Sequence, residues 1–195
     1  MAERQSALTG LLTPGVFGAA GPAGPGVEIR EWKPLTAVQV AAFDPERAAC
    51  SIGTALGVPA PAGRNGVATA GDSTIFWTGP GRWLVVEPES RDLASLLAGH
   101  CPGDVAAVTD LSHARTTLRA ERPKVRDLLA KLCTLDLDPA VFPPGTCAQT
   151  QLGQIAVLLY CRVEDGFDIF LPRSFAASAW ESIIDAALEF GCRVS

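Results

Sequence analysis

The first half of the chain alternates between the two-residue period of a strand and the spacing of a one-sided helix. Residues 27–32 alternate apolar and polar side chains, as a half-buried strand does, and residues 37–43 form a second apolar run. Three more strands are predicted in this half, at residues 73–77, 83–86 and 105–110. The first two of these are joined by residues 79–82, Gly-Pro-Gly-Arg, which is a typical hairpin turn.

Two helices are predicted between these strands. Asp44 followed by Pro45 is a strong helix start, and Gly57 is a typical helix end. The apolar stripe of this helix is Ala48, Ala49, Ile52 and Leu56. Ser90 is positioned to cap the second helix, whose apolar residues are Leu93, Leu96 and Leu97. The predicted order is strand, helix, strand, strand, helix, strand.

The second half repeats this order. A strand at residues 114–120 leads into a helix that Pro123 opens. A long hairpin at residues 155–171 follows, with Glu-Asp-Gly as its turn. Ser174 is expected to cap the last helix and Gly191 to end it. The inward-facing positions of the two helices are Val125, Leu128, Leu129 and Leu132, then Phe175, Trp180, Ile183, Ile184, Ala187 and Leu188.

The repeated order predicts an α+β fold of two pseudo-repeated strand-helix-strand-strand-helix-strand units, with mixed or antiparallel sheets covered by helices on one side. We expect residues 27–195 to form a single globular domain, with pseudo-halves at about 27–111 and 112–195. Residues 1–26 are expected to form an extended tail, because the glycines and prolines of residues 10–26 are too dense for a helix or a sheet ladder. Its apolar residues favour contact with a partner subunit, and a disordered end is the alternative.

Composition argues against two classes of binding partner, nucleic acid and membrane. The formal net charge is −5 and no basic cluster is present, which argues against binding to nucleic acid. No apolar run approaches the ~20 residues of a membrane span, and the N-terminus lacks the pattern of a secretory signal. A cytoplasmic location is therefore expected, with neither nucleic acid nor membrane as a partner.

Metal and nucleotide sites are not predicted. The six cysteines form no C-x-x-C pair, and buried free thiols explain them better than disulfides do. His100 and His113 are not at metal-ligand spacing. The glycine-rich stretch at residues 21–26 contains prolines, which lack the backbone N–H groups that a phosphate needs. No catalytic, cofactor-binding or metal-binding residue is assigned to this chain.

Asp110, Ser112 and His113 are the residue types of a hydrolytic triad. On a regular strand, however, Ser112 and His113 would point to opposite faces, so a local triad is disfavoured. A polar network that ties two strands together is the better interpretation. The residues alone leave open whether Asp110 and His113 are structural or lie near the cofactor of a partner.

Two further segments have competing interpretations. Arg82 and Trp83 at the predicted hairpin tip could anchor a partner, or Trp83 could be core and Arg82 solvated. Residues 139–146 form a stiff, proline-rich connector, beneath which Phe142 is expected to enter the core.

Several segments together resemble the gamma subunit of heterotetrameric sarcosine oxidase. They are Gly79–Val86, Thr109–Arg115, Leu128–Cys133, Leu135–Pro139, Phe142–Gly145, Cys147–Thr150, Pro172–Ala176 and Trp180–Glu181. Each motif is weak alone, but their order matches across nearly the whole chain beyond the tail. The resemblance implies a fold similar to that of the folate-binding aminomethyltransferases.

The resemblance also implies a function. The parent enzyme has alpha, beta, gamma and delta subunits and oxidatively demethylates sarcosine to glycine, giving hydrogen peroxide and formaldehyde or methylene-tetrahydrofolate. Its FAD, FMN, NAD and tetrahydrofolate belong to partner subunits, so the gamma chain would be non-catalytic and carry no cofactor. No pterin-binding acid is matched in this sequence, and folate binding is not carried over.

Two alternatives stay open. The chain could belong to a related dehydrogenase of another N-methyl amino acid, such as N-methylglutamate. It could instead be a free-standing folate-dependent one-carbon transferase, which would need a pterin pocket with a convergent carboxylate. Saturable binding of tetrahydrofolate by the lone chain separates the second alternative from the others.

Overall fold

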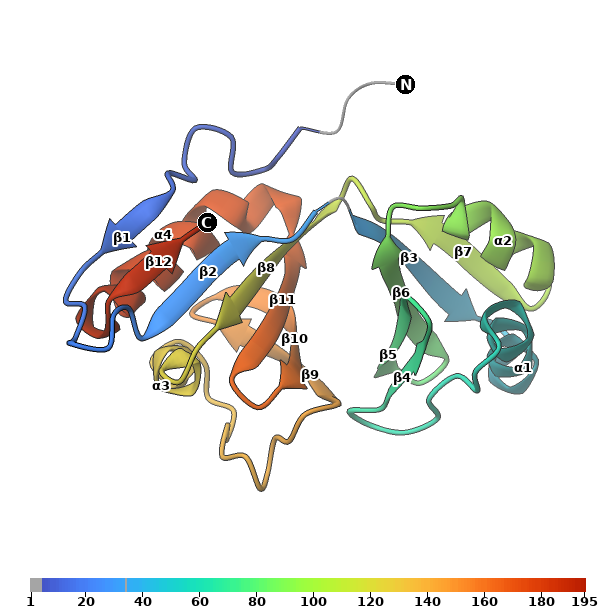
Figure 1. Ribbon diagram of the computed structural model, residues 1–195. Helices are drawn as coiled ribbons and strands as arrows, with labels where there is room; N and C mark the ends of the chain where they lie inside the picture. The colour runs from blue at the N-terminus through green and yellow to red at the C-terminus, as the bar shows by residue number, and fades with distance from the viewer. Residues whose placement is uncertain (1–4, 34) are drawn as a thin grey trace. The chain divides into compact units, whose positions relative to one another are not determined.

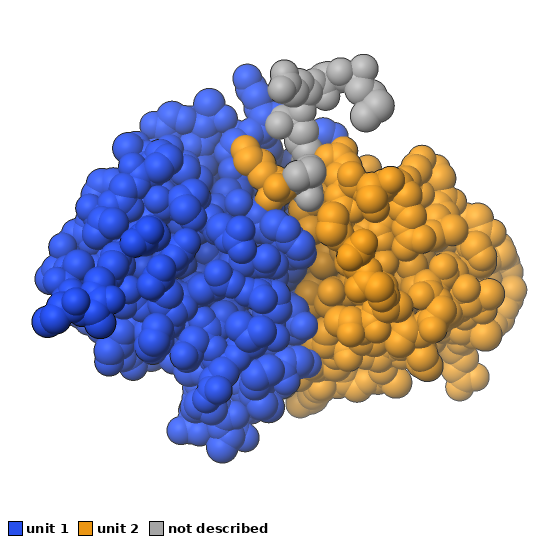
Figure 2. Space-filling view, viewed as in Figure 1, with its two compact units in different colours: residues 1–32, 113–195 blue, residues 33–112 orange. Residues whose placement is uncertain are grey.

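The computed structural model describes residues 5–33 and 35–195, which form two compact units. Unit 1 contains the N-terminal segment up to Trp32 together with residues 113–195, and unit 2 contains residues 33–112 (Figure 2). The chain therefore builds part of unit 1, then all of unit 2, and then completes unit 1.

Unit 2 is an antiparallel sheet with two helices on one face (Figure 1). Its strands are β3 (Leu35–Ala42), β4 (Val67–Ala70), β5 (Ser73–Gly79), β6 (Arg82–Pro88) and β7 (Ala106–Asp110), paired in the order β4-β5-β6-β3-β7. The helices are α1 (Pro45–Leu56) and α2 (Leu93–His100). Alternate residues of the central strands, such as Val38 and Val85, meet Ile52 and Leu97 of the helices in one core.

Unit 1 is a larger, mixed sheet (Figure 1). Its strands are β1 (Gly15–Phe17), β2 (Val27–Glu31), β8 (Arg115–Glu121), β9 (Thr146–Leu152), β10 (Ile155–Val163), β11 (Gly166–Pro172) and β12 (Cys192–Val194). They pair in the order β1-β12-β2-β8-β11-β10-β9, and only the β12–β2 pair is parallel among the described strands.

The helices of unit 1 are α3 (Val125–Ala130) and α4 (Ala176–Ala187), with the short 3-10 turns η1 (Arg173–Phe175) and η2 (Leu188–Phe190) at the ends of α4. Leu128 and Trp180 from these helices share a core with Leu118 and Ile169 of the central strands. Phe142 is buried in the same core, as the sequence predicted.

The α+β class and the repeated element order are confirmed. Unit 2 runs β3, α1, β4, β5, β6, α2, β7, and unit 1 runs β8, α3, β9, β10, β11, α4, β12. The sheet orders also correspond, except that β2 of unit 1 lies between β8 and β12. Each repeat contains one strand more than predicted, because β4 was taken for loop and nearly all of β9 was left unassigned.

The N-terminal tail takes part in unit 1. The prediction that residues 10–26 hold no sheet ladder is wrong, because β1 pairs with β12 at the edge of the sheet. Only three residues are needed, and they lie between the breakers Pro14 and Gly18. Leu8 is only 1% exposed and belongs to the core of unit 1, so the segment is anchored upstream as well.

Helix ends were predicted with mixed success. Asp44 caps α1 by accepting a hydrogen bond from the Arg47 amide at 3.1 Å, and Gly57 closes the helix at φ 75°, both as predicted. Asp92, not Ser90, caps α2. Ser174 does not cap α4, because the 3-10 turn η1 precedes that helix and supplies its entry.

Candidate functional site

The Asp110–Ser112 segment holds two strands of unit 2 together. Asp110 ends β7, and its carboxylate accepts a hydrogen bond from the Ser112 amide at 2.8 Å. The buried Ser112 hydroxyl oxygen accepts from the Ala37 amide of β3 at 3.0 Å. The predicted polar network between strands is confirmed. In it, the hydroxyl oxygen of Ser112 is already hydrogen-bonded to a backbone amide.

His113 takes no part in this network. It is exposed and belongs to unit 1, and its side chain has no hydrogen-bond partner among residues 5–33 and 35–195. A nucleophile needs a base within hydrogen-bond reach. The side chains of Asp110 and Ser112 therefore bind backbone amides, and the role of this segment is structural.

Trp83 is a core residue. It is 3% exposed, packs among the apolar residues of unit 2, and donates its indole N–H to the Pro61 carbonyl at 2.8 Å. Arg82 is exposed. The alternative in which Trp83 anchors a partner is wrong, because β6 directs this side chain toward α1 and α2.

A buried ion pair lies in the middle of the unit 1 sheet. Asp168 of β11 is 1% exposed and stands opposite Arg119 of β8 and Tyr160 of β10. Its two carboxylate oxygens accept from Arg119 Nε at 2.7 Å and Nη2 at 2.9 Å. This fork geometry is the strongest that an arginine and a carboxylate can form.

The surroundings complete this pair. Burial opposes the charge of Arg119, but its hydrogen bonds with Asp168 and the negative charges of Asp168 and Glu121 together outweigh burial and raise the pKa of the guanidinium. The guanidinium also lies 4.2 Å from the centre of the Trp32 ring. Arg162, which pairs with Glu121, brings its Nε to 4.0 Å from Asp168. Together, Asp168, Arg119 and Arg162 hold strands β8, β10 and β11 to one another.

Unit 2 has its own buried carboxylate. Glu87 of β6 is 1% exposed; it accepts from Ser73 at 2.6 Å and from two nitrogens of Arg91 at 2.9 and 2.8 Å. Burial would raise the pKa of Glu87, but these hydrogen bonds outweigh it and hold the pKa below its usual value. The group lines a polar cavity of about 430 Å³ beside the β4–β5 turn. Its oxygens already have partners, so it fits a structural role.

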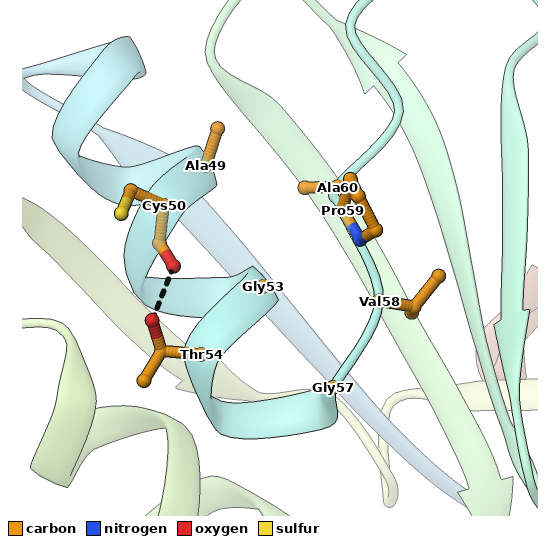
Figure 3. Close-up of a pocket in the computed structure, with 8 residues that line it drawn as sticks. All are labelled: Ala49, Cys50, Gly53, Thr54, Gly57, Val58, Pro59 and Ala60. Atoms are coloured by element: carbon orange, nitrogen blue, oxygen red, sulfur yellow. Dashed lines mark hydrogen bonds between the residues drawn. The ribbon is translucent and has the colours of Figure 1, made fainter.

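A second cavity, of about 610 Å³, lies between α1 and the loop that follows it (Figure 3). Its lining is small and mostly apolar, and the loop residues Val58 to Ala60 face Gly53 of the helix. Thr54 donates its hydroxyl hydrogen to the Cys50 carbonyl at 3.0 Å. This lining contains no charged side chain that could orient a substrate.

Comparison with known proteins identifies the family. A model of the sarcosine oxidase, gamma subunit family matches residues 39–189. The sarcosine oxidase subunit gamma of Arthrobacter sp. is 33% identical over 168 residues, covering 84% of this chain and 81% of the relative. The chain belongs to the sarcosine oxidase gamma subunit family.

Solved structures agree with this gamma-subunit assignment. A chain of the heterotetrameric sarcosine oxidase from Corynebacterium sp. U-96 matches with a TM-score of 0.85 and 29% identity, over 96% of both chains. The glycine cleavage system aminomethyltransferase T of Bartonella henselae matches with a TM-score of 0.67 and 16% identity, over 93% of this chain and 57% of that one. The second likeness concerns the fold and confirms the predicted similarity to aminomethyltransferases.

The structure offers neither a metal-binding cluster nor a membrane-spanning helix within the residues that it describes. Across the described residues, no three histidine, cysteine or acidic side chains gather as a metal-binding group. Within the same part of the chain, no helix has both the length and the apolar character that a bilayer crossing requires.

The cysteines of this gamma-subunit chain are free thiols, as predicted, and five of the six are buried. Burial raises the pKa of Cys147 to about 12 and that of Cys192 to about 11. Because the thiolate is the reactive form, we expect a thiol reagent at mildly alkaline pH to modify only Cys50 in the folded protein. Counting modified thiols by intact mass checks this.

Cys50→Ser is the matched control, which should abolish labelling of the folded chain. Denaturant should expose all six thiols of the unsubstituted chain. Rapid modification of two or more thiols without denaturant would contradict the burial of the other five.

Proposed function

We propose that this chain is the non-catalytic gamma subunit of a heterotetrameric flavoprotein sarcosine oxidase. The complex oxidatively demethylates sarcosine to glycine and passes its electrons to oxygen. The partners are alpha, beta and delta subunits, the location is cytoplasmic, and FAD, FMN, NAD and tetrahydrofolate are held by the partners. The observation that carries this proposal is the correspondence over 96% of both chains with a subunit of a heterotetrameric sarcosine oxidase.

The internal chemistry supports a scaffold role. Asp168 and Glu87 are each held by an arginine of the same unit, and Ser112 is held by a backbone amide. Such groups position strands, whereas a catalytic carboxylate needs a lone pair free for substrate or proton transfer. The chain is therefore expected to contribute a shaped surface to the complex rather than reactive groups.

The test is capture of the tagged chain from its native host. We expect three partner chains to co-purify. The purified complex should show the absorbance spectrum of bound flavin and should form hydrogen peroxide from sarcosine. The isolated chain should show none of this turnover and no saturable binding of tetrahydrofolate. Comparing sarcosine with N-methylglutamate as substrates identifies which N-methyl amino acid the complex oxidises.

An untagged host lysate passed over the same resin is the control for adventitious flavoproteins. Turnover of an N-methyl amino acid by the chain alone would contradict the scaffold role. Saturable binding of tetrahydrofolate by the chain alone would favour a folate-dependent transferase instead.

A further inference from the structure

Strand β8 begins with an arginine that has no counter-ion among the residues that the structure describes. Arg115 is partly buried, yet among the described residues its side chain makes no hydrogen bond and no ion pair. Two other partly buried arginines behave differently, because Arg119 is held by Asp168 and Arg162 by Glu121. Arg115 thus differs from these paired arginines.

An uncompensated charge at such a position is unfavourable. Removing a guanidinium from water costs free energy that a carboxylate partner normally offsets. Here burial lowers the pKa of Arg115, and no acid in the described ranges 5–33 and 35–195 raises it again. An anion from outside the chain would remove this penalty.

The surroundings of Arg115 form a coherent surface of unit 1. Arg115 stands opposite Pro172 in the β8–β11 ladder, and the Arg173 amide donates to the Ala114 carbonyl at 2.8 Å. We call this surface the β8 patch; it consists of His113, Ala114, Arg115, Arg173, Ser174 and Phe175.

The charge and polarity of the β8 patch define what it can bind. It has two arginines and a histidine and no acidic residue, in a chain whose net charge is −5. In the described part of the chain the Arg173 side chain is also without a hydrogen-bond or ion-pair partner. Phe175 is 49% exposed and adds an apolar contact beside the cations. Arginine next to an exposed aromatic is the combination enriched at interface anchors.

We propose that the β8 patch receives an acidic segment of another subunit of the oxidase, with Arg115 pairing with a carboxylate of that segment and Phe175 packing beside it. The proposal rests on the subunit role proposed above. A nucleic-acid backbone fits less well, because it would need many more clustered cations than these. A protein carboxylate matches the fork of a single arginine.

The test measures how tightly the purified chain binds the subassembly of the other three subunits. Arg115→Met removes the charge and keeps an unbranched chain of similar length. We expect its dissociation constant to rise about 10- to 100-fold and to depend less on salt, because a buried charge-assisted contact is lost. The thermal midpoint of the isolated variant should equal or exceed that of the unsubstituted chain, since no internal partner is lost.

Arg64→Met is the matched control. Arg64 is an exposed arginine of unit 2, and within the described residues its side chain also lacks a partner. It should change the dissociation constant by less than about twofold. Charge reversal, Arg115→Glu, should weaken assembly further, and a lysine in place of the matching partner carboxylate should restore it.

The outcomes separate the two proposals. If the Arg115→Met variant binds the subassembly as tightly as the unsubstituted chain does, the patch proposal is overturned. The proposed subunit role is not affected by that result. A variant that unfolds in isolation would show that Arg115 has an internal role and would overturn it too. Failure of the unsubstituted chain to bind any partner subunit would end the subunit role, and the patch proposal with it.

Discussion

Replacing Asp168 with alanine is expected to destabilise the protein by about 3–5 kcal/mol, the range seen when one partner of a buried ion pair is removed. Asp168 is 1% exposed, and both its oxygens hold Arg119. Without it, Arg119 keeps its charge at a position where its side chain is only 12% exposed, and Arg162 loses the nearby carboxylate. Denaturant unfolding of the two proteins, compared as free energies, measures the loss.

Asp104→Ala is the matched control, because it also removes an arginine partner. Arg47 and Asp104 lie 3.2 Å apart with both side chains more than half exposed, so this change should cost less than about 1 kcal/mol. The double variant Asp168→Leu, Arg119→Met should recover much of the loss, because it leaves no charge unpaired. If Asp168→Ala costs no more than Asp104→Ala, the pair does not hold the sheet.

Half of this ion pair could be predicted from the sequence. Asp168 interrupts the apolar run at residues 167–171, and an acid in the middle of such a strand needs a partner. Its partner Arg119 is 49 residues away, and only the β8–β11 register places the two opposite each other. The local sequence pattern shows that Asp168 needs a counter-ion. The pairing of β8 with β11 determines that this counter-ion is Arg119.

The same distinction explains which elements were predicted. Helix α1 follows from residues at its own two ends, Asp44 and Pro45 at the start and Gly57 at the finish, because capping is local chemistry. The strands β4 and β9 lie at sheet edges and are rich in alanine, threonine and glutamine, so their apolar signal is weak. They are strands because β5 and β10 pair with them.

Strand β2 shows where non-local pairing overrides chain order. Its alternation predicted a strand correctly, but the predicted N-terminal half placed it with residues 37–111. In the structure it pairs with β8 and β12, both from the C-terminal part of the chain. Nothing in residues 27–32 alone specifies those partners.

Replacing Arg126 with methionine is expected to destabilise the protein by about 2–4 kcal/mol, because several buried or partly buried acceptors lose their donor together. Arg126 of α3 donates to the carbonyls of Leu137 and Phe142, to the carbonyl of Glu164 at 3.0 Å, and to Cys161 Sγ at 3.5 Å. Its guanidinium also lies 5.0 Å from the centre of the Phe167 ring.

One arginine thus ties residues 131–145, the segment between α3 and β9 that includes most of the proline-rich connector, to the unit 1 core. The segment has little regular structure of its own, apart from turns in which Asp136 and Asp138 accept from nearby backbone amides at 3.0 and 2.8 Å. Loss of the Arg126 bonds should therefore release this segment before the sheet unfolds. Limited proteolysis should cut the variant within residues 131–145 under conditions that leave the unsubstituted chain intact.

Lys124→Met is the control at the same helix. Lys124 pairs with Asp127 at 2.8 Å with both side chains about half exposed, so its loss should leave both the free energy of unfolding and the cleavage pattern essentially unchanged. Equal protease resistance of Arg126→Met and the unsubstituted chain would mean that the connector is held by Phe142 in the core and not by the guanidinium. The two contributions are separable because Phe142→Ala removes the apolar anchor while keeping every Arg126 acceptor, which are backbone carbonyls and one thiol.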